Sequence, residues 1–212
     1  PNNIGWIKHI DPSMHYIASI FYFNSDWNFP IGLNPQYGEN ISSTIILSDS
    51  LPIISIPLKL LLYKQNVMFQ FLGVWTFLCI FFQIYFSQKL LGIFSSKSIF
   101  LILGSLFFVF SPPFLMRIGL HSALLSHFFI IISLYLIFSN KNKPISWFFL
   151  ITASLLTHAY IFVMVYFLWI ASLIDEQKIL ITTKIKIFIV INIVLILLMF
   201  ILGYFLDISG GE

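Results

Sequence analysis

The chain has 212 residues, of which 59% are hydrophobic, 18% aromatic and only 9% charged, and its mean hydropathy is +0.97. A typical soluble domain has roughly 25% charged residues, so the composition excludes that class and predicts an all-α polytopic membrane protein. The formal net charge is +3 and the Lys and Arg residues are dispersed, which excludes a basic face for nucleic acid.

A single cysteine, Cys79, lies within an apolar run, so no disulfide framework can be drawn and a place in the core is predicted. The chain begins at Pro1 and lacks the positive-then-apolar pattern of a signal peptide. Its polar first segment has to be delivered to its side of the membrane, and a spanning helix upstream of Pro1 is the simplest means. We therefore expect the parent protein to be longer at both ends.

Residues 1–66, the outer segment, are rich in polar and turn-forming residues, and we expect them outside the membrane. Asp11 before Pro12 is a helix-start signal, because aspartate accepts hydrogen bonds from free amides and proline suits the first helical position. The predicted elements are a surface helix over residues 12–23, a loop over 24–50 and a short helix over 51–63 that dips into the outer leaflet. Both helices are shorter than the roughly 20 residues that a crossing needs.

Residues 67–206 are predicted to form the membrane helices. Single crossings are predicted over residues 67–86, 99–110, 121–138 and 188–206. Residues 145–174 are too long for one ordinary crossing. If they form a hairpin that turns near Thr157 and His158, the positive-inside rule is satisfied, because every lysine after residue 66 then shares one side. These lysines are Lys89, Lys97, Lys141, Lys143, Lys178, Lys184 and Lys186.

This topology makes the outer face acidic and the inner face basic. It places Asp11, Asp26, Glu39, Asp49, Asp207 and Glu212 outside, and Asp175 and Glu176 inside. With the upstream helix the count is seven spans, six of them in this chain. No internal repeat is found, so we predict a single domain, with residues 207–212 as the start of a further outer segment.

Asp11 is the first candidate for chemistry, because it stands where a polar segment meets an amphipathic helix, with His15 one helical turn later on the same face. The plainer interpretation is a helix cap, and the two roles are compatible. Asp49 is interpreted as the cap of the helix over 51–63, with a role as a second site carboxylate as the weaker alternative. Lys59, the only charge in that helix, is expected to reach the headgroup level and contact phosphate.

Arg117 and His121 are four residues apart, just beyond a Pro-Pro break. A guanidinium suits a phosphate or pyrophosphate clamp, but a lone arginine at a membrane boundary also serves as a snorkelling anchor. His158, at the outer turn of the predicted hairpin, is expected at the same level. His127 is six residues from His121 and on another helix face, so it is predicted to pack between spans rather than to share a metal with His121.

Four stretches of the chain carry a resemblance to a known family. They are IGWIKHIDPSMHYIASIFYF, FPIGLNPQYGENISSTIILSDSLPIISIPLKLL, RIGLHSALLSHF and LLTHAYIFVMVYFLWIAS. In them the chain resembles a bacterial family of multi-pass membrane proteins of unknown function that is related to the GT-C superfamily of glycosyltransferases. The superfamily link rests on layout: one span, a long outer loop with surface helices, and six more spans.

The resemblance implies a function and a location. GT-C enzymes transfer a sugar from a polyprenyl-phosphate donor to a glycan or lipid acceptor on the outer face of the membrane, which for this chain would be the bacterial inner membrane. An acidic residue early in the first outer loop is their catalytic base or orients the acceptor, and Asp11 holds that position. The residues then expected to bind substrate are His15, Asp49, Lys59, Arg117, His121 and His158. Some members add a divalent metal through an acidic motif in a later outer loop, but residues 111–120 contain no carboxylate, so no metal ligand is predicted.

In the implied mechanism Asp11 activates an acceptor hydroxyl, which attacks the anomeric carbon, and Arg117 stabilises the departing lipid phosphate with help from Lys59 or His121. A transporter or flippase is the main alternative, because Arg and His within a membrane also line substrate pathways. That alternative predicts ionisable groups at the midplane, whereas here most of them are expected at the outer boundary. A non-catalytic assembly subunit is the third interpretation, and it would tolerate loss of Asp11.

Overall fold

The computed structural model describes residues 4, 5, 7, 10–38, 43–65, 69–139, 143–177 and 179–206. Five of the charged residues used to predict the topology lie outside this part: Glu39, Asp207 and Glu212, predicted on the outer side, and Lys141 and Lys178, predicted on the inner side. The described part is mostly helical, as predicted. Its helices are α1 (Ile10–Asn24), α2 (Pro52–Leu62), α3 (Leu72–Leu91), α4 (Ser98–Val109), α5 (Pro112–Leu115), the 3₁₀ helix η1 (Ala123–Leu125), α6 (Phe128–Phe138), α7 (Pro144–Leu155), α8 (Ala159–Asp175) and α9 (Ile181–Leu202). Two short strands, β1 (Leu33–Asn34) and β2 (Ser43–Thr44), pair antiparallel with Leu33 opposite Thr44.

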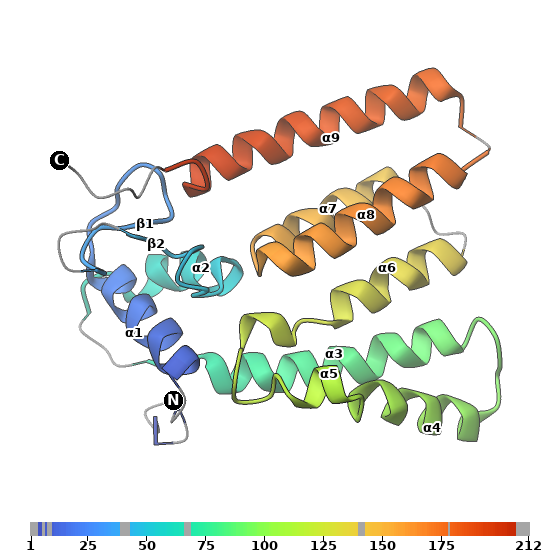
Figure 1. The fold of residues 1–212 in the computed structure, drawn as a ribbon, viewed down its shortest axis with the longest axis horizontal. Helices are drawn as coiled ribbons and strands as arrows, with labels where there is room; N and C mark the ends of the chain where they lie inside the picture. Colours follow the sequence, from blue (N-terminus) through green and yellow to red (C-terminus); the bar gives the residue numbers. More distant parts are fainter. Residues whose placement is uncertain are drawn as a thin grey trace.

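The long helices form a bundle, and the outer segment covers one end of it (Figure 1). α3 packs against α4 and α6, α6 against α8, and α7 against α8, while α9 lies at the edge beside α7. α1, α2 and the strand pair lie where α3 begins and α9 ends, and we call this the α1 end. α3, α6 and α8 finish at the opposite end, where α4, α7 and α9 start.

The predicted hairpin within residues 145–174 is confirmed. α7 stops at Leu155 and α8 starts at Ala159, and the two helices pack side by side. His158 is the residue that caps α8, since its Nδ1 accepts a hydrogen bond from the Tyr160 amide at 3.0 Å. The turn lies at the α1 end, so the described lysines after residue 66 gather at the opposite end, which we call the lysine end. They are Lys89, Lys97, Lys143, Lys184 and Lys186.

The predicted span over residues 121–138 is wrong in its first part. Helix α6 begins only at Phe128, because residues 121–127 form turns around η1. Ser126 Oγ donates a hydrogen bond to the Ala123 carbonyl oxygen at 2.7 Å, and such local bonds compete with a continuing helix. The correction moves His121 and His127 out of regular helix and into the turns at the α1 end.

Two helices of the described part are long and apolar enough to cross a membrane: α3 with 20 residues and α9 with 22. α9 begins at Ile181 rather than at residue 188, because Lys184 and Lys186 are good helix formers. α4, α6, α7 and α8 have 11 to 17 residues, short of the roughly 20 that a crossing needs. The predicted layout of six spans in this chain is therefore not confirmed.

Backbone contacts fix the end of α9 to the outer segment. The Ile31 amide donates to the Ile201 carbonyl oxygen at 2.8 Å. A Cβ at Gly32 would collide with the Leu202 carbonyl oxygen, so the two backbones meet where only glycine fits. α9 then ends at Gly203, whose φ of 90° lies in the left-handed region that stops a helix.

We expect Gly32→Ala to destabilise the protein by about 1–3 kcal/mol, the usual cost of overpacking, because the backbone of α9 cannot rotate away from the added methyl group. Thermal unfolding in detergent, followed by tryptophan fluorescence, measures this. Gly104→Ala in α4 is the matched control, since its Cβ meets only the movable end of the Leu91 side chain. An unfolding temperature for Gly32→Ala equal to that of the wild type would contradict the close contact.

Candidate functional site

Four side chains from distant parts of the sequence meet at the α1 end of the bundle. His15 comes from α1, Asp49 from the segment between β2 and α2, His121 from the turn before η1, and His158 from the turn between α7 and α8. We call these four residues the histidine–aspartate cluster. It is the largest grouping of predicted site residues that the structure brings into contact.

The Asp49 carboxylate lies at the centre of the cluster. Its Oδ1 is 3.3 Å from His158 Nε2 and its Oδ2 is 3.5 Å from His121 Nε2. The ring of His121 lies between the other two imidazoles, with centroid distances of 5.0 Å to His15 and 5.3 Å to His158. Both nitrogen–oxygen distances exceed the roughly 2.7–3.2 Å of good N–H···O hydrogen bonds, so the two imidazoles face the carboxylate closely but without a strong hydrogen bond.

Asp49 does not cap α2, contrary to the sequence interpretation. The capping position is Leu51, and no side chain bonds the first amides of this helix. The Ile53 amide, one of those that a cap would satisfy, instead donates to the Leu156 carbonyl oxygen at 2.7 Å. Asp49 and Leu51 both have positive φ, 49° and 51°, a conformation that costs a non-glycine residue free energy and is found mainly at functional sites.

Hydrogen bonds tie the segments around the cluster to one another. Ser50 Oγ donates to the His15 carbonyl oxygen at 3.3 Å, which joins the Asp49 segment to α1. The Ile53 amide donates to the Leu156 carbonyl oxygen at 2.7 Å, which joins α2 to the α7–α8 turn. The Tyr204 hydroxyl donates to the Leu155 carbonyl oxygen at 3.0 Å, which adds the end of α9. The segment that carries Asp49 is therefore bonded to α1 directly and to the α7–α8 turn through α2, and that turn is in turn bonded to the end of α9.

Backbone amides determine where the protons of two imidazoles lie. His158 Nδ1 accepts from the Tyr160 amide at 3.0 Å, and His121 Nδ1 accepts from the Leu124 amide at 3.4 Å. An accepting ring nitrogen carries no proton, so in the neutral rings the proton sits on Nε2, the atom that faces Asp49. The bond to His158 is short and fixes its tautomer, whereas the bond to His121 is long and weak.

His15 is the most deeply buried member of the cluster. Its side chain is 6% exposed, and its Nδ1 has no hydrogen-bond partner among the described residues. Burial, with the neighbouring His121 ring, lowers the pKa of His15 to about 4. Burial also lowers the pKa of His158, which Asp49 opposes. Both rings are therefore neutral at physiological pH.

Asp11 and Arg117 stand beside the cluster rather than in it. α1 begins at Ile10, so Asp11 lies within the first turn and is not the cap that the sequence suggests. It is exposed, one turn before His15, and close enough for its charge to oppose the lowering of the pKa of that imidazole. Arg117 is also exposed, in the turn after α5, where its charge adds to the lowering of the pKa of His158.

Lys59 does not join the cluster. Its side chain is 1% exposed, and its Nζ donates to Ser25 Oγ at 3.0 Å and to the Asp26 carbonyl oxygen at 3.1 Å. The ammonium also lies 4.0 Å from the centroid of the Tyr22 ring and 4.7 Å from that of Trp27. These contacts hold the residues that follow α1 against α2, so the structure gives Lys59 a packing role, and its phosphate contact stays a prediction.

Asp49 is central to the cluster, although its sequence context favoured a capping role. It also belongs to a set of three metal-compatible side chains that was not predicted. His15, Asp49 and His121 each offer a ligand atom, and these atoms all lie within 4.8 Å of one another. No signal in the sequence pointed to this set, because tertiary contacts bring its members together from α1, the segment before α2 and the turn before η1. His127, as predicted, packs away from His121: its ring faces Phe114 at a centroid distance of 5.8 Å.

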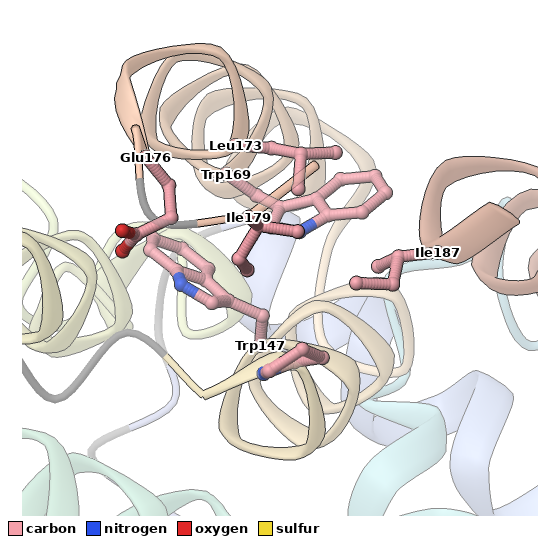
Figure 2. A pocket seen from close by; sticks show the side chains of 7 residues that line it. Trp147, Trp169, Leu173, Glu176, Ile179 and Ile187 are labelled. Carbon is pink, nitrogen blue, oxygen red and sulfur yellow. The ribbon is translucent and has the colours of Figure 1, made fainter. Parts of the chain in front are cut away.

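A pocket at the lysine end is too small to compete as a site (Figure 2). Trp147 and Trp169 face it from α7 and α8, and Ile187 faces it from α9. It offers about 10 Å³ for the centre of a water molecule, enough for about one water. We interpret it as a packing defect between three helices.

The burial of Lys59 predicts a pH effect on stability. Burial lowers its pKa from 10.5 to about 8, while Asp26 opposes the shift. Between pH 8 and 10 the unfolded chain then binds more protons at this site than the folded chain, so stability rises with pH. We expect the unfolding temperature of the wild type, measured in detergent, to rise relative to that of Lys59→Met as the pH increases from 8 to 10.

Lys64→Met is the matched control for that measurement. Lys64 is exposed and Asp26 raises its pKa, so its contribution to stability is present at lower pH and is lost as the pH rises. That loss falls above the ordinary lysine pKa of 10.5, because the pKa of Lys64 is raised from that value. Between pH 8 and 10 the difference in unfolding temperature between wild type and Lys64→Met should therefore stay nearly constant. A constant difference between wild type and Lys59→Met from pH 7 to 10 would show that Lys59 titrates as it does in water.

Comparison with known proteins places the chain in a family. No curated protein and no solved structure matches it. A family model does match, over residues 1–212, and its description is Domain of unknown function (DUF6311). This match covers the whole chain and confirms the predicted membership of a family of unknown function, while a relationship to GT-C enzymes is not shown. The chain thus belongs to the DUF6311 family.

Proposed function

We propose that the protein is a multi-pass glycosyltransferase of the bacterial inner membrane, which transfers a sugar from a polyprenyl-phosphate donor to a glycan or lipid acceptor on the outer face. The observation that carries the proposal is the histidine–aspartate cluster, flanked by Asp11 and Arg117, at one end of an apolar bundle. Such a place suits a substrate whose lipid tail lies in the bilayer and whose sugar phosphate lies at its surface.

The exterior of the bundle supports a place in the membrane. Only 28% of the apolar window of α3 and 17% of that of α9 is buried inside the structure, whereas the core helix of a soluble protein is mostly buried. Large exposed side chains such as Phe107 and Ile174 continue this surface over α4 and α8. A monomeric soluble protein rarely exposes so much apolar area. The lysine end fits the cytoplasmic side by the positive-inside rule, which puts the α1 end outside.

The chemistry we propose uses Asp11 as the general base. Its carboxylate takes the proton of the acceptor hydroxyl as the new oxygen–carbon bond forms at the anomeric carbon of the sugar. The bond between that carbon and the phosphate oxygen breaks, and the lipid phosphate leaves with the negative charge, which the Arg117 guanidinium stabilises. A single displacement of this kind inverts the anomeric carbon. His15, Asp49, His121 and His158 form the neighbouring wall of the site.

We expect Asp11→Asn to lower the transfer rate by about 10²- to 10⁴-fold, the usual contribution of a general base. The measurement is transfer of radiolabelled sugar from polyprenyl phosphate by the full-length protein in proteoliposomes. Asp26→Asn is the matched control, because Asp26 is an exposed carboxylate of the same segment that pairs with Lys64 at 2.6 Å, away from the cluster. It should retain wild-type transfer.

Three outcomes separate the candidate functions. Loss of transfer in Asp11→Asn with a normal Asp26→Asn supports the proposal. Transfer by Asp11→Asn at the wild-type rate removes Asp11 from the mechanism. If the wild type transfers no sugar but moves lipid-linked sugar between the leaflets of the proteoliposome, the protein is a flippase and the proposal fails.

A further inference from the structure

We infer that His15, Asp49 and His121 form a binding site for a divalent transition metal of the Zn²⁺ type, with His158 as the residue that holds Asp49 in place. The inference concerns metal binding alone and goes beyond the proposed function. Its test does not depend on whether the protein transfers sugar.

The donor set selects the class of metal. Two imidazole nitrogens and one carboxylate oxygen suit Zn²⁺ and its neighbours among the transition metals, whereas Mg²⁺ and Ca²⁺ prefer oxygen ligands alone. Three protein ligands are also the number found in catalytic zinc sites, where the fourth position takes water or substrate. The single cysteine, Cys79, lies buried within α3 and takes no part in the set.

The distances fit a tetrahedral ion. Ligands that lie roughly 2.0–2.1 Å from zinc at tetrahedral angles are about 3.3 Å from one another. His121 Nε2 and Asp49 Oδ2 are already 3.5 Å apart. The widest separation in the set, within 4.8 Å, exceeds the tetrahedral edge by at most about 1.5 Å, so small side-chain shifts would bring the three ligand atoms to tetrahedral spacing.

His15 supplies an independent observation. A buried polar atom normally has a partner, because leaving it without one costs free energy. His15 is only 6% exposed, yet its Nδ1 has no hydrogen-bond partner among the described residues. The ring lies beside His121, within the proposed ligand set. A metal ion would complete the bonding of this side chain.

The position of the proton on His158 indicates that this residue supports a metal ligand and does not bind the metal itself. Its Nδ1 accepts the short bond from Tyr160, so its Nε2 carries the proton and points a donor, not a lone pair, at Asp49 Oδ1. Partners of this kind orient a ligand carboxylate in many metal sites. His121 differs, because its bond from the Leu124 amide is 3.4 Å long. Moving its proton to Nδ1, which frees Nε2 for the metal, sacrifices only that weak contact.

Metal binding by the full-length protein tests the inference. The protein is purified in detergent without a polyhistidine tag, stripped with a chelator and titrated with Zn²⁺. We expect about one tightly bound zinc per chain. His15→Asn, His121→Asn and Asp49→Asn should each lower the affinity by more than about 100-fold, and His158→Gln by about 10- to 100-fold, as for outer-shell partners. His127→Asn, the matched control outside the cluster, should bind zinc as the wild type does.

X-ray absorption of the zinc-loaded wild type reads the ligands without any substitution, so a variant that fails to fold does not leave the question open. We expect two imidazole nitrogens, oxygen ligands and no sulfur. The inference is overturned if the wild type binds no zinc, if sulfur is among the ligands, or if the three ligand variants keep wild-type affinity. It is also overturned if His158→Gln loses zinc as completely as the ligand variants, because His158 would then be a ligand itself.

Discussion

The Asp49 carboxylate imposes the strictest constraint on this structure. It sits partly shielded from water among three imidazoles, and a shielded charge is tolerated only where partners compensate for lost hydration. Two histidines face its two oxygens, and each of these histidines is oriented in turn by a backbone amide, from Tyr160 or Leu124. The positive φ angles of Asp49 and Leu51 add a cost that the surrounding contacts have to offset.

This constraint explains why the outer segment is folded onto the bundle. Asp49 reaches His121 and His158 only because α2 is bonded to the α7–α8 turn, through Ile53 and Leu156, and because α1 brings His15 against the same point. The end of α9 adds a second attachment, where Gly32 allows two backbones to touch. Lys59 stabilises the outer segment itself, because its buried ammonium joins α2 to the residues after α1. The site is therefore a product of tertiary contacts between elements that are far apart in sequence.

The sequence was sufficient for what depends on local pattern. Apolar runs predicted the helices, and the distribution of lysines predicted the break near His158, because both follow from periodicity and charge alone. The structure places all seven proposed site residues at the α1 end, and four of them in contact. Long-range packing decided what the sequence left open or got wrong. Asp49 was interpreted as a cap because it stands shortly before a helix. Its positive φ, which turns it away from α2, cannot be predicted from the residue type. Lys59 resembled a headgroup contact because its aromatic partners, Tyr22 and Trp27, are more than thirty residues away.

The position of the ionisable groups bears on the choice between surface chemistry and transport. Within the described helices α3, α4, α6, α7, α8 and α9, the charged residues lie among the first or last six residues, as Lys89, Asp175 and Lys186 do, and the middles contain no charged residue. A pathway for a phosphate-bearing substrate through the bundle would need cationic groups at mid-depth to compensate for lost hydration. The polar side chains that lie there, such as Gln83 in α3 and Asn192 in α9, are uncharged. The grouping of imidazoles, carboxylates and a guanidinium at the α1 end instead favours a reaction at the membrane surface, on a substrate whose apolar part never has to leave the lipid.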